Sequence, residues 1–158
     1  MTPDSPALLN IGLYAPRIAQ NVGQIGRTCF AMGLSLNLIR PFGFRLDARE
    51  LRRAGVGYWD SLDPTIYPDG EAYWDSAPPR TFLVTKHGER SYLDVEFRPG
   101  DGLLFGNETE GFPPAWLEQR GPQTIRIPML HPEARCLNLA TSVSVVAFEA
   151  LRKMGGIS

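Results

Sequence analysis

The chain has 158 residues, of which 43% are hydrophobic and 21% charged, and its formal net charge is −1. This composition is typical of one soluble globular domain and excludes a disordered or collagen-like chain. The near-neutral charge excludes a general electrostatic attraction to nucleic acid. No apolar run approaches the roughly 18 residues of a membrane span, and no basic region precedes an apolar stretch at the N-terminus. We therefore expect a cytoplasmic protein.

Cysteine and arginine usage narrows the options further. Cys29 and Cys136 form no C-x-x-C pair, which predicts reduced thiols and neither a disulfide framework nor a zinc site. Arginine accounts for 14 of the 16 basic residues, and five arginines fall between Arg40 and Arg53 against only two acidic residues. That segment carries three net positive charges. It is either a solvated helix face or a phosphate-binding surface, for which the planar guanidinium is suited.

Strand-like apolar runs alternate with helical periodicity along the N-terminal half. Helix boundaries are predicted from residues that favour caps, since Asn and Asp accept hydrogen bonds from free helix amides and Gly ends helices. The Pro-rich stretch 61–79 is expected to be mostly loop with a short strand and helix. The other predicted elements are a strand over 8–14, a helix from an Asn21 cap to Gly33, a strand over 36–40, and a short helix from an Asp47 cap to Gly55.

The C-terminal half continues the alternation. We predict strands over 80–86, up to Phe105 and over 124–129, with a short Pro-initiated helix over 113–121 and a long final helix. That helix carries Val145 and Phe148 outside its main apolar stripe, which favours burial in a core or, preferably, at a homodimer interface. The order predicts an α/β fold with a mostly parallel sheet flanked by helices, as one domain over 8–155 after a disordered stretch 1–7.

Loops at the carboxyl ends of parallel strands are the expected ligand sites. No nucleotide motif fits them, because "GNETEG" lacks the lysine of a phosphate loop and "GVGYWD" lacks the third glycine of a dinucleotide loop. His87 and His131 have no metal-ligand spacing, so we expect no metal. Cys136 is either a nucleophile or a packing residue, and Glu108 with Glu110 either an acid/base pair or solvated. Asn138 is predicted to cap the last helix.

Three segments occur in an order that is specific in combination. "NVGQIGRTCFAMG", "LLFGNETEGFP" and "IRIPMLHPEARCLNLATSVSVVAFEAL" each follow or end a predicted strand. Together they resemble the signature motifs of the SPOUT superfamily of RNA methyltransferases, in its ribose 2′-O-methylating branch. The stretch "RPFGFRLDARELRRAGVGYWD" is similar to one in the small TrmL (YibK-like) enzymes, and the resemblance covers residues 9–153.

The resemblance implies a C-terminal deep trefoil knot, an exception to the rule that chains avoid knots. It also implies that knot loops bind S-adenosyl-L-methionine, mostly through backbone groups. Glycine and proline suit such loops, and short apolar residues suit an adenine wall. By position, the cofactor residues would be Val84, Gly106, Ile127, Met129, Cys136 and Leu137.

The implied reaction is methyl transfer to the 2′-hydroxyl of a wobble nucleotide, cytidine or modified uridine, in the anticodon loop of tRNA. Arg27 matches the family's catalytic arginine, either as a base or, as its high pKa favours, as a group that orients and stabilises the forming alkoxide. Asn21, Glu108 and Asn138 match residues that fix this arginine and the ribose. The family homodimer places the arginine-bearing segment of one subunit beside the cofactor pocket of the other.

The arginine-rich segment then becomes a candidate tRNA contact through Arg49, Arg52 and Arg53, with an affinity that falls as salt rises. The alternatives are ribosomal RNA or another tRNA position as substrate, or a non-catalytic RNA-binding relative. Two departures from the family pattern concern specificity. Cys136 replaces a common serine and offers weaker hydrogen bonds, and Phe148 replaces a common tyrosine.

Overall fold

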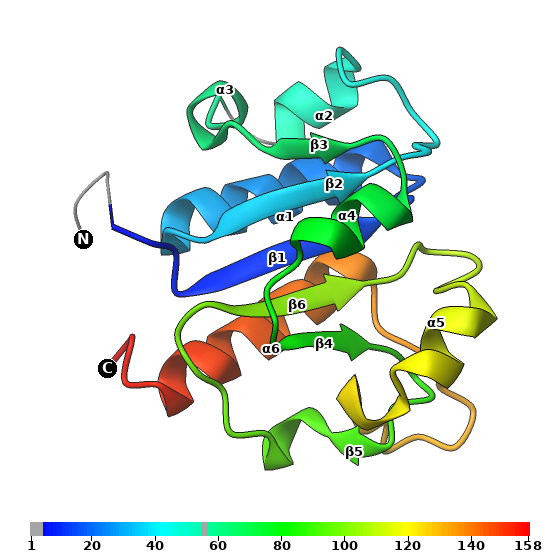
Figure 1. The fold of residues 1–158 in the computed structure, drawn as a ribbon. Helices are drawn as coiled ribbons and strands as arrows, with labels where there is room; N and C mark the ends of the chain where they lie inside the picture. The colour runs from blue at the N-terminus through cyan, green and yellow to red at the C-terminus, as the bar shows by residue number, and fades with distance from the viewer. Residues whose placement is uncertain (1–4, 55–56) are drawn as a thin grey trace.

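Parallel strands form one twisted sheet through the middle of the protein (Figure 1). The computed structural model describes residues 5–54 and 57–158. Within these residues the sheet has seven strands in the order β3-β2-β1-β6-β4-β7-β5, and each neighbouring pair is parallel. The strands are β1 Leu9–Tyr14, β2 Ser35–Ile39, β3 Thr65–Tyr67, β4 Thr81–Val84, β5 Arg90–Ser91, β6 Asp101–Phe105 and β7 Thr124–Arg126.

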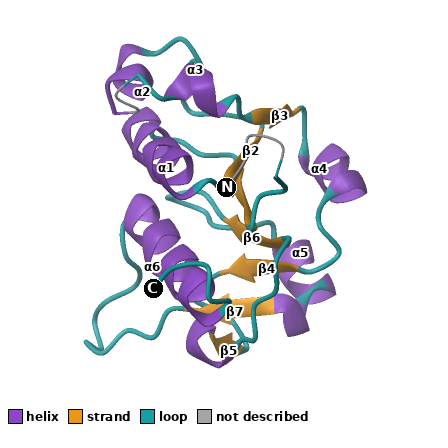
Figure 2. Cartoon of the chain, turned by 90° about the vertical axis from the view of Figure 1, so that its left-hand side faces the viewer, coloured by secondary structure: helices purple, strands orange, loops and turns teal. Residues whose placement is uncertain are grey.

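Helices cover both faces of this sheet. The α-helices are α1 Ala19–Met32, α2 Arg49–Ala54, α3 Trp59–Leu62, α4 Gly70–Ser76, α5 Pro114–Gln119 and α6 Leu139–Lys153, and short 3-10 turns lie at Tyr92–Asp94 and Gly121–Gln123. Figure 2 shows α1 and α6 on one face and α4 and α5 on the other. The predicted α/β architecture is confirmed: the sheet is parallel, and its central strand β6, covered by helices on both faces, is buried along its whole length.

The long helices α1 and α6 place their first turns at the edge of the sheet where the strands end. Each follows a strand whose carboxyl end lies at that edge, and the two helices contact one another (Figure 1). Their buried residues form most of the helical side of the main core, including Ile25, Cys29, Val143 and Val146. Two helix N-termini therefore meet beside the loops that follow β1, β6 and β7.

Two predicted helix caps are wrong. α1 begins at Ala19, two residues before Asn21, and its N-cap is Ile18 with no side-chain hydrogen bond. Asn21 is instead 7% exposed and its side chain points to the loop after β6. Asp47 does not cap α2, because its carboxylate accepts hydrogen bonds from Arg45 and the helix begins at Arg49. The expected stop at Gly55 and residues 1–4 of the predicted disordered stretch lie outside the described residues.

The Pro-rich stretch 61–79 contains the predicted short strand and helix, β3 and α4, and also the end of α3, so less of it is loop than expected. Asp69 is the N-cap of α4, and its carboxylate accepts a hydrogen bond from the amide of Ala72 at 2.8 Å. The predicted caps at Gly33, in the left-handed region at φ 67°, and at Asn138 are confirmed. None of the described helices is long and apolar enough to cross a membrane.

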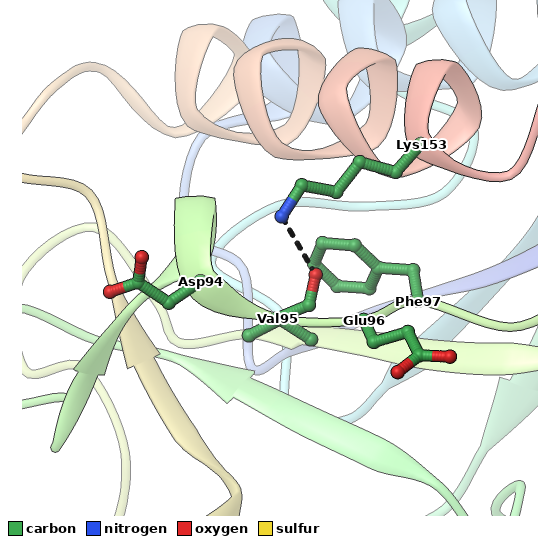
Figure 3. Close-up of a pocket in the computed structure, with 5 residues that line it drawn as sticks. All are labelled: Asp94, Val95, Glu96, Phe97 and Lys153. Atoms are coloured by element: carbon green, nitrogen blue, oxygen red, sulfur yellow. Dashed lines mark hydrogen bonds between the residues drawn. The ribbon is translucent and has the colours of Figure 1, made fainter.

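The far end of α6 is tied to the segment that precedes β6. Lys153 Nζ donates to the carbonyl oxygens of Leu93 and Val95, the latter at 2.9 Å, beside a small cavity of about 310 Å³ (Figure 3). On the same helix Val145 is half-buried and Phe148 is 42% exposed. The single chain therefore leaves part of the surplus apolar surface of α6 uncovered.

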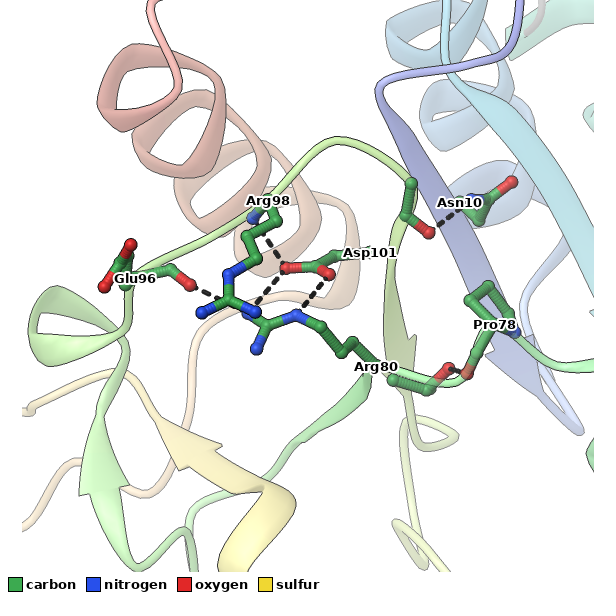
Figure 4. Close-up of polar contacts among 8 residues, drawn as sticks. Asn10, Pro78, Arg80, Glu96, Arg98 and Asp101 are labelled. Atoms are coloured by element: carbon green, nitrogen blue, oxygen red, sulfur yellow. Dashed lines mark hydrogen bonds and ion pairs between the residues drawn. The ribbon is translucent and has the colours of Figure 1, made fainter.

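A second polar anchor lies at the start of β6, at the opposite edge of the sheet from the loops described below. Asp101 is 2% exposed, and its carboxylate accepts hydrogen bonds from Arg80 Nε at 2.8 Å and from the amide of Arg98 at 2.8 Å (Figure 4). The hydrogen bond from Arg80 to Asp101 raises the pKa of that arginine. A buried carboxylate with several donors is satisfied, as burial of a charge requires.

Candidate active site

The loop after β6 is a tight turn held by its own side chains. The amide and carbonyl of Asn107 and Gly111 pair in both directions at 3.2 Å, and Gly111 adopts φ 70°. Asn107 is 8% exposed, and its Oδ1 accepts from the amides of Thr109 and Glu110. A Cβ on Gly106 would lie 2.6 Å from the carbonyl carbon of Gly111, so only glycine fits there. The turn thus presents Glu108 in a fixed position.

Glu108 joins this turn to the start of α1. Its carboxylate accepts from the amides of Arg17 and Ile18 at 2.9 and 2.8 Å and from Asn21 Nδ2 at 3.3 Å. Ala15, at φ 48° directly after β1, turns the chain into this segment. A left-handed conformation is unfavourable for a residue with a Cβ and is found preferentially at functional sites. Glu108 therefore fixes the chain directly before α1, although it does not cap the free amides of the first turn.

Asn21 extends the network to α6. Asn138 Nδ2 donates to Asn21 Oδ1 at 3.1 Å, while Asn138 Oδ1 accepts from the amides of Ala140 and Thr141. The direction of each bond is forced, because a carboxylate only accepts and a helix-terminal amide only donates. Asn138 therefore donates a hydrogen bond to Asn21, and Asn21 donates one to Glu108. Three of the four predicted catalytic residues come together at the edge where α1 and α6 begin.

Arg27, the fourth, lies apart from this network. It is six residues after Asn21 in α1, which corresponds to about 9 Å along the axis and roughly 120° around it. The side chain is exposed and makes no hydrogen bond or ion pair with residues 5–54 or 57–158. It lines a groove of about 650 Å³ between α1 and α2, together with Gln20, Gln24, Thr28, Glu50 and Arg53.

The predicted cofactor residues follow three adjacent strands. β4 pairs with both β6 and β7, so their carboxyl ends meet at one edge. Val84 ends β4 and Ile127 follows β7, and both are half-buried against the main core. Gly106 follows β6. Met129 is half-buried, whereas Cys136 and Leu137 are exposed at the end of the connection to α6, with Leu137 37% exposed.

These residues fit a cofactor that presents an adenine and no phosphate. Val84 and Ile127 offer apolar walls at neighbouring strand ends, and Leu137 leaves apolar surface uncovered beside the first turn of α6. Apolar walls with a few polar groups are the usual lining of small-molecule sites. Among the residues that the structure describes, no group of three or more His, Cys, Asp or Glu could hold a metal ion.

The predicted RNA contacts differ in their surroundings. Arg49, Arg52 and Arg53 are all exposed on α2. Arg52 forms an ion pair with Asp60 at 3.3 Å, whereas Arg53 lies in the groove that Arg27 lines. The side chains of Arg49 and Arg53 make no ion pair or hydrogen bond within the described part of the chain. Positive charge is therefore left unpaired on both sides of the groove.

Sequence reasoning missed two residues that hold the site. Asn107 organises the turn that carries Glu108, and its position between glycine and glutamate in "GNETEG" is typical of a turn-forming asparagine. Arg17 donates its amide to Glu108 and pairs through Nη2 with Glu110 at 3.2 Å. No local pattern indicated Arg17, because its partners lie more than 90 residues further along the chain.

Comparisons with known proteins agree with this geometry. Residues 8–148 match the model of the SpoU rRNA Methylase family. The chain is 41% identical to a tRNA (cytidine(34)-2′-O)-methyltransferase of Escherichia coli strain K12, over 94% of this chain and 95% of that protein. A solved structure from work on the 2-OH methylation of C/U34 on tRNA superposes with a TM-score of 0.90 at 41% identity, covering 97% of this chain and all of that one.

A more distant relative was solved with its cofactor. The SpoU methyltransferase AviRb of Streptomyces viridochromogenes in complex with AdoMet matches with a TM-score of 0.82 at 26% identity, over 96% of this chain and 59% of that one. The family match and the coverage of the closely similar relatives extend over nearly the whole described fold. The chain belongs to the SpoU methylase family, and its α/β fold is that family's trefoil-knot fold.

Proposed function

We propose that the protein transfers a methyl group from S-adenosyl-L-methionine to the ribose 2′-hydroxyl of the wobble nucleotide, cytidine or modified uridine, in tRNA anticodon loops. The observation that carries the proposal is the hydrogen-bonded set Glu108, Asn21 and Asn138 at the carboxyl edge of the sheet. These residues match the family positions that fix the catalytic arginine and the ribose. The Escherichia coli relative is named for methylation of cytidine 34, and the similar structure at 41% identity comes from work on C/U34 of tRNA.

The cofactor supplies an electrophilic methyl group, and the residues of the chain position what reacts with it. Val84, Gly106, Ile127, Met129, Cys136 and Leu137 are the proposed cofactor contacts. The side chains of Glu108 and Asn138 are held rigidly by backbone amides. Glu108 accepts from the amide of Ile18, directly before α1, and Asn138 accepts from the amide of Ala140, in the first turn of α6. A fixed acceptor beside the 2′-hydroxyl would align its oxygen for in-line attack, and alignment alone can contribute a large part of the rate.

Arg27 needs a second subunit to take part in methyl transfer. Within one chain it faces the α1–α2 groove and does not reach Glu108, Asn21 or Asn138. A homodimer could place the Arg27 of one subunit beside the cofactor loops of the other, where its fixed charge would stabilise the forming alkoxide. The exposed Phe148 on α6 and Ile18 before α1, 42% and 47% exposed, are apolar surface suited to such an interface.

The tRNA backbone would contact α2 through Arg49, Arg52 and Arg53. Phosphate contacts of this kind position an RNA without reading its sequence. The net charge of −1 means that such a local surface must supply the attraction. Action on tRNA supports a cytoplasmic location for the enzyme.

The test is incubation of the pure protein with methyl-labelled cofactor and total tRNA, followed by mass spectrometry to locate the methylated nucleotide. We expect 2′-O-methyl label at position 34 of a subset of tRNAs. Arg27→Ala should lose at least two orders of magnitude in turnover and still bind the cofactor in calorimetry. Label only in ribosomal RNA or at another tRNA position would reject the substrate, and absence of cofactor binding by the wild-type protein would reject the reaction.

A further inference from the structure

The groove between α1 and α2 has the chemistry of an RNA-strand site. It measures about 650 Å³ and is lined by the amides of Gln20 and Gln24, the hydroxyl of Thr28 and the guanidinium groups of Arg27 and Arg53. Each of these groups can donate hydrogen bonds, and the two guanidinium charges have no partner in the described chain. Glu50 is the one acidic residue in the lining. An anionic ligand rich in hydrogen-bond acceptors would satisfy such a surface.

A pair of stacked aromatic rings lies one helical turn beyond Arg27, although neither ring lines the groove itself. Phe30 follows Arg27 by three residues and is therefore its neighbour on the surface of α1. Its ring stacks on Tyr58, with centroids 4.5 Å apart and planes inclined by 9°. The rings are 41% and 40% exposed, although large aromatic residues usually lose more of their surface in a fold of this size. Exposed aromatic faces beside positive charge are typical of proteins that bind unpaired bases.

We infer that the α1–α2 groove binds the nucleotide adjacent to the one that is methylated, with Arg53 on its phosphate and the Phe30–Tyr58 pair stacked against its unpaired base. This inference rests on the proposed function, which brings Arg27 to the reacting ribose. Because Arg27 lines the same groove as Arg53, the RNA strand that leaves the reacting ribose enters the groove. Gln20 and Gln24, one turn apart on α1, face that strand and can donate to its ribose or base oxygens.

The experiment measures tRNA binding and methylation kinetics of single variants at several salt concentrations. Arg53→Gln should raise KM and lower the salt dependence of binding by about 0.7 in the slope of log affinity against log salt, the value for one phosphate of single-stranded RNA. Glu50→Gln removes the acidic group in the lining and should tighten binding at low salt. The matched control is Arg98→Gln, which removes the same charge from an exposed arginine at the opposite edge of the sheet.

Tyr58 provides a test of stacking independent of charge. Tyr58→Leu should weaken tRNA binding about fivefold or more without changing the salt slope, whereas Tyr58→Phe should bind as the wild type does because it keeps the ring. Cofactor affinity and thermal unfolding, measured for every variant, establish that the fold and the cofactor site are intact.

Failure of this inference is distinct from failure of the proposed function. If the wild-type protein methylates tRNA but Arg53→Gln behaves as Arg98→Gln does, the groove is not an RNA site. The same conclusion follows if Arg53→Gln or Tyr58→Leu turns a dimer into a monomer in sedimentation, because the groove would then be an interface between copies. If the wild-type protein methylates no RNA, the proposed function itself is wrong.

Discussion

Asn21 sits between a carboxylate that can only accept hydrogen bonds and an amide nitrogen that can only donate them. An aspartate at this position would still accept from Asn138, but it would set a second negative charge against Glu108. One of the two carboxyl groups would then have to hold a proton, so the pKa of the pair would rise. We expect Asn21→Asp to destabilise the fold by about 2 kcal/mol at neutral pH and to abolish methyl transfer.

Urea unfolding at several pH values checks this expectation. A carboxyl group whose pKa is raised in the folded state destabilises the protein at high pH, and the loss is recovered as the pH falls through that raised value. The control is Gln20→Glu, which adds the same charge to an exposed position one residue away. Equal stability of Asn21→Asp and Gln20→Glu at pH 7 would contradict the assigned network.

The two cysteines should react very differently. Burial raises the pKa of Cys29 to about 12, and its side chain is inaccessible, whereas Cys136 is exposed. Since the thiolate is the reactive form, iodoacetamide at pH 8 should modify one thiol per chain, and peptide mass spectrometry should locate it at Cys136. Cys29 should react only after unfolding. We expect S-adenosyl-L-methionine to protect Cys136 from iodoacetamide, because this residue is a proposed cofactor contact. Equal labelling with and without the cofactor would show that Cys136 does not lie at the cofactor site.

At the scale of helices and strands, the sequence predicts the order of elements well and their ends less well. Strands β1 and β6 lie in the middle of the sheet, and their mostly apolar runs identify them clearly. The start of α1 was placed at Asn21 because asparagine is a good cap, yet Glu108, 87 residues away, satisfies the chain before the helix. A contact made across such a distance leaves no local pattern. β5 is not predicted for a different reason, since two residues are too few to show a strand's alternation.

The anchor at the start of β6 gives an element-scale prediction. Asp101→Asn removes the charge that receives Arg80 and the amide of Arg98, and we expect the free energy of unfolding to fall by about 1–3 kcal/mol, discounted because Arg80 is partly exposed. Asp47→Asn is the control, since it breaks the exposed ion pair with Arg45 and should change stability by less than about 0.5 kcal/mol. The midpoint of urea unfolding measures both, and similar shifts would show that Asp101 is no anchor.

For the whole molecule, three motifs in order were sufficient to predict the family and three of the residues that meet at the site. Glu108, Asn21 and Asn138 converge because parallel strands end at one edge and both long helices begin there. The place of Arg27 could not be predicted, since it depends on which face of α1 each residue occupies relative to α2. The sequence also could not separate Arg53, in the groove, from Arg52, which pairs with Asp60.

The assembly can be tested through the exposed apolar residue on α6. If Phe148 lies at the interface of a homodimer, Phe148→Asp should produce a monomer with little methylation activity, because Arg27 would lose the partner's cofactor loops. Phe148→Leu keeps an apolar side chain and should remain dimeric. Sedimentation at micromolar concentration distinguishes these states. A monomeric wild-type protein would contradict the proposed dimer.

The hydrogen bond between Asn21 and Asn138 joins residues that are 117 positions apart in the chain. During synthesis, the N-terminal half with α1 and the first strands leaves the ribosome long before Asn138 is made. A nascent or prematurely terminated chain that lacks α6 would therefore contain Arg27 and all of α2 but could not complete the site. RNA bound by such a fragment would not be methylated, so methyl transfer begins only after α6 has been made and packed against α1.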